Sequence, residues 1–357
     1  MMKAEIVFNR SSHICRLMTG FHLLEKQGIL SCRYIEKENQ LIPGSHKAVV
    51  EVRIDHRRIV FDLGDRSALH HAAGKAYLSD VDMYFERSHE DWSRRTEYAE
   101  QADKIKPFGF DYYASYPHNP ADKKPGSFSQ RIKAGLKAIT GVSRCTGVDA
   151  IEGRADYKEN NIRILFMTRL WDPAEIVFDP DENAEVREYQ EYLVYERNKI
   201  NKERIEICRS LQSAYPYSFV GGIQYGKYAS ELCPDLILPD SLTRKHIYLK
   251  TMKNADICIG SAGLHKSIGW KTGEYVAAAR AIVCEEPAYL LPGDFCKGIN
   301  YCSYHDVDSC LREVNELFDH PERIYRMKCA NEAYYHNYLR PEKQIMNALR
   351  QCGIPDC

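Results

Sequence analysis

Residues 257–283 read ICIGSAGLHKSIGWKTGEYVAAARAIV, and this stretch decides the fold. An apolar run, ICIG, gives way to glycine, serine and histidine, then to a segment with helical character, and then to a second apolar run, AIV. A strand, a polar turn, a helix and another strand form the βαβ unit of a parallel sheet. The stretch therefore predicts an α/β fold, in which Lys271 and Glu274 lie where a strand passes into a helix.

The same alternation continues on both sides of this stretch. In the second half, apolar runs at 161–168, 218–222, 236–238 and 281–284 alternate with helical segments at 188–210, 244–252, 307–318 and 323–347. In the first half, apolar runs occur at 4–8, 48–52, 58–61, 81–85 and 104–107, with a helix at 17–27. Such alternation is typical of doubly wound sheets. We predict two Rossmann-like domains facing a cleft, at 1–156 and 157–322, followed by C-terminal helices at 323–357.

Length and composition narrow the class of protein. A chain of 357 residues fits two domains, and a net charge of −1 lacks the basic field of a nucleic-acid binder. The 13 cysteines form no CxxC pair and no zinc-finger spacing. The first residues, MMKAEIVFNRSS, do not have the pattern expected of a secretory signal, and no run of about 20 apolar residues occurs in the sequence. We expect a cytoplasmic protein with reduced thiols and no nucleic-acid partner.

Two predicted strand-to-helix turns of the C-terminal domain have the composition of an anion site. Ligands of open parallel sheets collect at the carboxyl ends of strands, where helix N-termini present free N–H groups. Glycines let the backbone approach a ligand, while hydroxyls and a lysine suit a diphosphate. A tight turn with solvated lysines is the alternative, and neither GxGxxG nor GxxxxGK[ST] is present. The residues concerned are Arg169, Gly263, Ser267, Gly269, Lys271 and Thr272.

Glu274 is the most informative residue of the stretch. It lies near the start of the helix that contains YVAAA, where a carboxylate is favoured by the helix dipole. One interpretation is a capping carboxylate in the first turn. The other is a ligand group that accepts both hydroxyls of a ribose beside a diphosphate.

Residues 256–286, DICIGSAGLHKSIGWKTGEYVAAARAIVCEE, resemble the donor-site segment of GT-B glycosyltransferases of the group-1 type, as found in bacterial polysaccharide biosynthesis. On this resemblance Gly269 precedes the helix, Glu274 binds the ribose, and residues 277–279 are the small residues that pack on the sheet. NIRILFMTRL resembles the first strand of that family's C-terminal domain, and Arg169 the arginine that contacts the donor diphosphate. The resemblance covers most of 161–347 and implies that the last helices return to the N-terminal domain.

The chain departs from the family pattern at two positions. Lys266 stands eight positions before Glu274, where the family often has a glutamate, and the lysine that usually follows the arginine of the first strand is missing from TRLWDPAEIV.

The resemblance implies a metal-independent transfer of sugar from a nucleotide-diphosphate sugar to a glycan or lipid-linked acceptor, in surface-polysaccharide assembly. The nucleotide sugar is a substrate, and no cofactor is implied. Charge on the leaving diphosphate would be stabilised by Arg169, Lys271 and the helix N-terminus near Thr272. One Asp-Pro-Asp pattern, Asp179 to Asp181, has the spacing to share a divalent cation with a diphosphate; a solvated loop is the alternative.

Transfer to a hydroxyl also needs a base, which we expect from the N-terminal domain. In VFDLGDRSALHH, Asp62 and Asp65 follow an apolar strand, and we prefer Asp65 as the base. His13, in the first strand-to-helix turn, is the second candidate. Helix capping by the aspartates, and a hydrogen bond within the turn for His13, are the alternatives.

Two segments of the N-terminal domain suggest an acceptor. Tyr112, Tyr113, Tyr116 and His118 form an aromatic group that could stack on a sugar, or only anchor a loop. Residues 129–141 (SQRIKAGLKAITG) predict a basic amphipathic helix. It is either a solvated surface helix or a peripheral contact with the inner face of the cell membrane, which would favour a lipid-linked acceptor.

Two other hypotheses stay open. A nucleotide-sugar epimerase of the same fold would use the same donor site without an acceptor. A non-catalytic GT-B-like subunit of an assembly complex is the third hypothesis, and Lys266 in place of the family's glutamate keeps it open.

Overall fold

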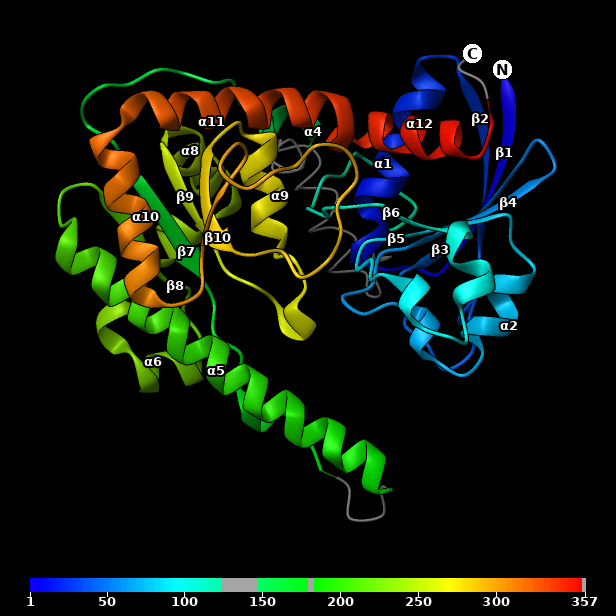
Figure 1. Ribbon diagram of the computed structural model, residues 1–357, viewed down its shortest axis with the longest axis horizontal. Helices are drawn as coiled ribbons and strands as arrows, with labels where there is room; N and C mark the ends of the chain where they lie inside the picture. Colours follow the sequence, from blue (N-terminus) through cyan, green and yellow to red (C-terminus); the bar gives the residue numbers. More distant parts are fainter. Residues whose placement is uncertain (123–146, 179–182, 355–357) are drawn as a thin grey trace, which may run out of the picture.

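A computed structural model describes residues 1–122, 147–178 and 183–354. Within these residues the chain forms two β-sheets, each flanked by helices, which lie side by side in Figure 1. The basic helix predicted at 129–141 and the Asp-Pro-Asp pattern at 179–181 lie outside the described residues.

The N-terminal sheet has six strands in the order β2-β1-β3-β4-β5-β6. Neighbouring strands are parallel except that β3 runs antiparallel to both β1 and β4. Only Asp55 and His56 separate β3 from β4, and both have positive φ (47° and 64°). A two-residue turn of this kind closes a hairpin and leaves no room for a crossover helix. The strands are β1 (Met2–Phe8), β2 (Leu30–Glu36), β3 (Val49–Ile54), β4 (Arg57–Asp62), β5 (Met83–Glu86) and β6 (Ile105–Pro107).

The C-terminal sheet is parallel throughout, in the order β11-β10-β9-β7-β8. Every residue of β7 and β9 is buried, which is why these strands read as continuous apolar runs. Strand β7 pairs with β8 on one side and with β9 on the other, so the order in which strands are added to the sheet reverses at β7. At such a switch point the carboxyl ends of the two neighbouring strands, β7 and β9, border a crevice. The strands are β7 (Ile164–Thr168), β8 (Phe219–Ile223), β9 (Ile257–Gly260), β10 (Ala281–Glu285) and β11 (Cys302–Tyr304).

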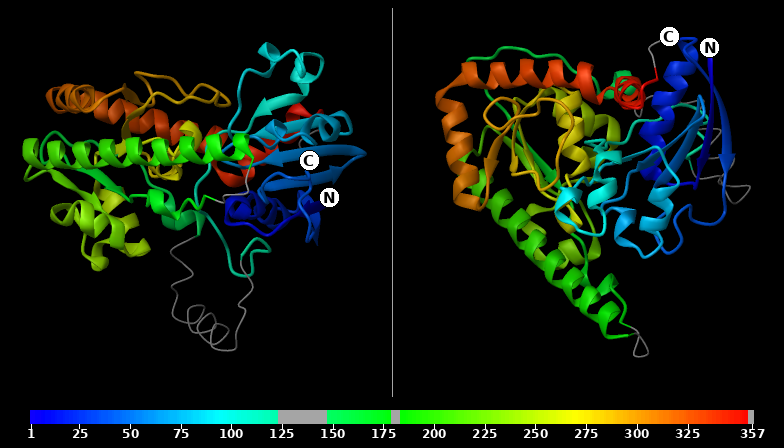
Figure 2. Two further views of the ribbon diagram at one scale, coloured as in Figure 1. Left: turned by 90° about the horizontal axis from the view of Figure 1, so that it is seen from below. Right: turned by 45° about the vertical axis from the view of Figure 1, so that its right-hand side comes forward.

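Helices cover both sheets, and α5 extends well beyond the C-terminal sheet in both Figure 1 and Figure 2. The α-helices are α1 (Cys15–Lys26), α2 (Gly74–Ser79), α4 (Val148–Ile151), α5 (Ala184–Ala214), α6 (Lys227–Leu232), α7 (Asp240–Thr243), α8 (Lys245–Asn254), α9 (Trp270–Ala277), α10 (Val307–Asp319), α11 (Pro321–Tyr334) and α12 (Pro341–Gln351). Short 3-10 turns lie at Ser12–Ile14, Ala68–His70, Trp92–Arg94, Ala99–Lys104, Pro173–Glu175, Pro234–Leu236 and Leu264–Lys266, and a π-helical turn at Tyr335–Leu339.

The last helix belongs to the N-terminal core. In Figure 1, α11 runs along the C-terminal half and α12 continues onto the N-terminal half, where Ile345 and Leu349 are buried in one cluster with Phe21. A Cβ at Gly20 of α1 would lie 2.5 Å from the carbonyl oxygen of Pro341, so this close contact requires glycine. The domain boundaries at residues 156 and 322 stay predictions.

The predicted architecture of two Rossmann-like α/β domains is confirmed by these two sheets, except that β3 makes the N-terminal sheet mixed, whereas the prediction was a parallel sheet. One local prediction is contradicted by the structure, and two strands were not predicted. The strand predicted at 236–238 is wrong: Pro234–Leu236 forms a 3-10 turn, and only Ile237 makes a single bridge to Ile223, because prolines on both sides of the segment lack N–H donors. Strands β2 and β11 were not predicted, since β2 is only partly buried and β11 has three residues.

The structure bears on two further expectations. The eleven cysteines within the described residues are all free thiols. Among the helices of the described residues, none has the combination of length and apolar character that crossing a bilayer requires.

Candidate functional site

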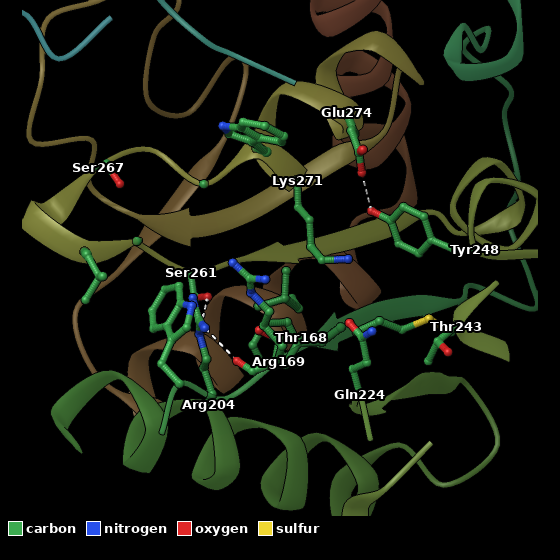
Figure 3. A pocket seen from close by; sticks show the side chains of 18 of the residues that line it. Thr168, Arg169, Arg204, Gln224, Thr243, Tyr248, Ser261, Ser267, Lys271 and Glu274 are labelled. Carbon is green, nitrogen blue, oxygen red and sulfur yellow. Dashed lines mark hydrogen bonds between the residues drawn. The ribbon is translucent and has the colours of Figure 1, made fainter. Parts of the chain in front are cut away.

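A cavity of about 610 Å³, the first cavity, lies at the carboxyl ends of β7 and β9 and is lined by both halves of the chain. Figure 3 shows Lys271 and Glu274 on one side of it and Thr168, Arg169 and Gln224 facing them. Its cationic side chains outnumber its carboxylates, so it suits an anionic ligand. The charged residues that line it are Asp65, Arg87, Arg169, Arg204, Lys245, Lys271 and Glu274.

Glu274 lies in the second turn of α9, which begins at Trp270, so it is not the first-turn capping carboxylate that was one of its two interpretations. Its side chain is buried, and both carboxylate oxygens accept hydrogen bonds from α8. Lys245 Nζ donates to one oxygen at 2.5 Å and the hydroxyl of Tyr248 to the other at 2.8 Å. Each oxygen keeps a second lone pair for a ligand hydroxyl. The carboxylate is therefore held in place at the wall of the cavity.

Lys271 precedes Glu274 by three residues, and its Nζ lies 3.9 Å from the centre of the Tyr248 ring. Burial lowers the pKa of Lys271 to about 8 against the opposing effect of Glu274, and the neighbouring Lys245 adds to the lowering. An anion bound beside Lys271 would raise this pKa again, because it stabilises the charged amine. The charge of Lys271 above pH 8 therefore depends on what the cavity holds.

Arg204 of α5 fixes the two turns that border the cavity. Its buried guanidinium donates to the carbonyl oxygens of Arg169 (2.7 Å) and Ala262 (3.0 Å) and to the hydroxyl of Ser261 (3.0 Å). The guanidinium also lies 4.2 Å from the centre of the Trp171 ring. Burial lowers the pKa of Arg204 to about 10. Since each of its three guanidinium nitrogens donates to a group of the protein, Arg204 positions the turns. The side chain of Arg169, in contrast, is exposed in the cavity.

The N-terminal domain supplies the opposite wall. Arg87 donates to the carboxylate of Asp65 at 2.5 Å and to the carbonyl oxygen of Ile268 at 2.6 Å, so one buried guanidinium joins the two domains. Burial acts to raise the pKa of Asp65, but Arg87 and the neighbouring His13 outweigh it and hold that pKa below its usual value. Asp65 is consequently a weak base.

His13 lies in the turn before α1, half-buried, with its ring 5.0 Å from that of Trp270 in an edge contact. Its Nδ1 atom is buried and makes no hydrogen bond within the described residues. Of the two base candidates, Asp65 is the one that the structure holds in an ion pair.

The structure brings most of the predicted site residues to one cavity. Thr272 is the exception, since it lines a separate void behind the turn together with Lys266. The predicted donor-site residues that line the first cavity are Arg169, Gly263, Ser267, Gly269, Lys271 and Glu274, together with the predicted base candidates His13 and Asp65.

Two other groups of predicted residues serve the fold. Asp62 is buried and accepts hydrogen bonds from the backbone N–H groups of Gly64 (3.1 Å) and Ala68 (2.7 Å), so it holds the loop after β4. The aromatic acceptor group is not at the cavity: Tyr112 is buried against Tyr335, and none of its four members lines the first cavity. Loop anchoring is the interpretation that the structure supports for this group.

Several residues that line the first cavity were not predicted from the sequence. Arg87 directly follows the carboxyl end of β5, so the rule that selected Asp65 could have selected it as well. Lys245 and Tyr248 are three residues apart on one face of α8, a spacing without a specific ligand meaning. Arg204 lies among many charged residues of α5, and nothing in the sequence distinguishes it.

No protein-family model matches the sequence, and no curated protein matches it. Solved structures are similar over nearly the whole chain. S. aureus MnaA, solved with UDP, is 12% identical over 99% of this chain and 98% of that chain, with a TM-score of 0.47. A putative UDP-N-acetylglucosamine 2-epimerase from Listeria monocytogenes is 10% identical over 99% and 97%, with a TM-score of 0.45. Anabaena HepE in complex with UDP-glucose is 11% identical over 98% and 100%, with a TM-score of 0.42. At these identities and TM-scores, the ligand of this chain is inferred from its own residues.

Proposed function

We propose that this protein is a glycosyltransferase that moves a sugar from a nucleotide-diphosphate sugar to a glycan or lipid-linked acceptor. The observation that carries the proposal is the set of cations around a buried carboxylate, Glu274, at the switch point of a parallel sheet. A diphosphate needs the cations, and the ribose beside it needs an acceptor of two hydroxyl hydrogen bonds.

The donor would lie across the first cavity. Its diphosphate would contact Arg169 and Lys271, and its ribose hydroxyls would donate to Glu274. Gln224 and Thr243 line the same cavity and offer polar groups to the edge of the base. This arrangement supports a nucleotide donor, because each part of the nucleotide meets a side chain of matching chemistry.

In the proposed reaction the acceptor oxygen forms a bond to the anomeric carbon, and the bond from that carbon to the diphosphate oxygen breaks. The bonding electrons leave with the diphosphate, whose growing negative charge Arg169 and Lys271 stabilise. The acceptor hydroxyl gives its proton to His13, which is favoured over Asp65 because the pKa of Asp65 is lowered by its ion pair with Arg87. In this proposal these cations take the part of a metal ion, so transfer is expected without one.

The proposal extends to a setting in surface-polysaccharide assembly at the cytoplasmic face of the membrane. A peripheral membrane contact depends on residues 129–141, which lie outside the described residues. Flotation of vesicles with and without anionic lipid tests that part separately.

Thermal unfolding with UDP, GDP, dTDP and CMP, and with sugars of each, tests the proposal. One nucleotide class should raise the melting temperature, because a ligand that binds only the folded state stabilises it. Incubation with the matching donor and an acceptor mixture should then yield a larger glycan, with or without EDTA. No shift with any nucleotide would sink the proposal.

Two outcomes would favour the alternatives. A changed sugar released from the donor in the absence of acceptor would indicate the epimerase. Nucleotide binding without either product would indicate the non-catalytic subunit.

A further inference from the structure

A second cavity of about 1050 Å³ opens on the far side of His13 and Asp65, which line both cavities together with Leu264. Its walls come from three places: the loops at 44–48 and 64–71 of the N-terminal domain, the first turns of α5, and the turn that contains His265. The candidate base is therefore at the junction of the two cavities.

Helix α5 builds one wall by leaving its own domain. It has 31 residues, and residues 183–189 are all exposed, so its first turns are not held by the C-terminal core. Figure 2 shows this end of α5 reaching toward the N-terminal half, and the guanidinium of Arg66 lies 5.8 Å from the centre of the Tyr189 ring. Long helices generally depend on packing of an apolar face. Here Val186, Tyr189 and Tyr192, three residues apart, turn that face to the second cavity.

His265 completes an aromatic wall with these tyrosines. Its ring is parallel to that of Tyr189, with centroids 5.8 Å apart, and its Nε2 is 3.0 Å from the Tyr189 hydroxyl. The backbone of His265 is left-handed (φ 59°) and is held there by Glu196, whose carboxylate accepts from its N–H, and by the hydroxyl of Tyr289, which donates to its carbonyl. A left-handed residue held by this many contacts indicates a functional constraint.

The rest of the wall is polar and carries charges of both signs. Lys47 and Arg66 line it together with Asp65, Glu185 and Glu188, and few aliphatic side chains are present, so neither an acyl chain nor a polyanion fits the lining. Burial lowers the pKa of His70, His71 and His265 and so disfavours their charged forms, whereas Asp62 outweighs burial and raises the pKa of His46. Aromatic rings for the apolar faces of a pyranose, with charged groups for its hydroxyls, match a neutral saccharide.

We propose that the second cavity binds the sugar residues of the acceptor, with Tyr189, Tyr192 and His265 stacking on a neutral saccharide whose reacting hydroxyl reaches His13. This inference rests on the proposed function, because an acceptor site has meaning only beside a donor site. The sugar residues are recognised without any lipid, so a free oligosaccharide suffices as the ligand.

The test compares saccharide binding with nucleotide binding in matched variants. Wild-type protein, saturated with the nucleotide that stabilises it, is applied to an array of immobilised mono- to tetrasaccharides, and each ligand found is titrated in solution. The double variant Tyr189→Ala/Tyr192→Ala removes two exposed rings, and His265→Gly removes the imidazole while keeping a residue that tolerates positive φ. Tyr195→Ala is the control, because Tyr195 is exposed on the same helix and does not line the second cavity.

We expect the wild type to bind at least one saccharide without a lipid aglycone, and the double variant to bind it roughly tenfold or more weakly. His265→Gly should weaken binding in the same direction, while Tyr195→Ala changes nothing. The thermal shift with nucleotide should persist in all variants.

Saccharide binding that is unchanged in the double variant would overturn the inference and leave the proposed function standing. So would a wild type that binds nucleotide but no saccharide, or only saccharides with a lipid aglycone. Loss of nucleotide binding in the double variant would show that α5 supports the donor turn instead. A wild type that binds no nucleotide would overturn the proposed function itself.

Discussion

The two cavities meet at His13 and Asp65, yet the protein builds them in opposite ways. The first cavity is built on buried side chains that form hydrogen bonds within the protein. Arg204 donates to the carbonyl oxygens of two turns, and the carboxylate of Glu274 accepts two hydrogen bonds. The second cavity is walled by the exposed first turns of α5 and by loops whose residues range from buried to exposed.

The difference in burial indicates that the two cavities have different tasks. A preorganised, buried site gives affinity for a ligand of fixed chemistry, and rigid elements hold its geometry. Loops and exposed helix turns tolerate change, which suits a ligand that differs between related proteins. We therefore expect substitutions in the first cavity to act on binding and stability, and those in the second to act on selectivity.

The largest effect is expected where the cavities join. His13→Gln should lower kcat by roughly 10²- to 10⁴-fold, because the proton of the acceptor hydroxyl loses its base. Affinity for nucleotide and for saccharide should both stay near wild type, measured by titration. If the kcat of His13→Gln falls by less than that, and the kcat of Asp65→Asn falls by more, the base is Asp65.

Arg204→Ala should destabilise the first cavity and, with it, the fold. Removing the buried guanidinium leaves two carbonyl oxygens and a hydroxyl without their donor, and we expect a loss of about 3 kcal/mol in the free energy of unfolding in urea. Arg209→Ala on the same helix is the control, since its ion pair with Asp235 is exposed, and it should leave the unfolding midpoint unchanged. Equal effects of the two variants would remove the distinction between the cavities.

Glu274→Ala should weaken nucleotide binding by about 2 kcal/mol, or roughly thirtyfold, because a charged acceptor of the ribose hydroxyls is lost. Isothermal titration measures this effect. Saccharide affinity of the second cavity should not change, which makes it the internal control. An unchanged nucleotide affinity would remove Glu274 from the site.

The smallest predicted effect is a pH dependence. Lys271 is charged below a pKa of about 8 and neutral above it, so its contribution to diphosphate binding is full at pH 7 and is lost as the pH rises. We expect about a tenfold fall in nucleotide affinity between pH 7 and pH 9. Lys271→Met should bind nucleotide weakly at both pH values, and its affinity should not fall between them. The same slope in wild type and variant would assign the titration to another group.

Part of the first cavity could be predicted from the sequence, because one contiguous segment, residues 259–274, supplies a large share of its lining. Strand β9, the turn and α9 are contiguous, so apolar runs, glycines and Glu274 could be interpreted together. The side chains that complete the cavity, Lys245 and Arg204, arrive from other helices and follow no spacing rule. Thr272 shows the same limit, since its direction depends on how α9 packs, and it faces away from the first cavity.

The second cavity could not be predicted from the sequence, for a related reason. Its parts come from residues 44–71, 185–192 and 265, and only tertiary packing brings them together. The helix prediction at 188–210 found most of α5 but not its first turn, where Asn183 accepts from the N–H of Val186 as the N-cap. In the N-terminal sheet, the Asp55-His56 turn lacked the usual glycine of a tight hairpin, so the strands predicted at 48–52 and 58–61 were not recognised as an antiparallel pair.

The most direct test of the proposed nucleotide site is a crystal structure of the protein with the nucleotide that gives the largest thermal shift. We predict a diphosphate between Arg169 and Lys271, ribose hydroxyls on Glu274, and a second cavity that holds no part of the nucleotide. A nucleotide bound in the second cavity, or one whose ribose lies away from Glu274, would contradict the account.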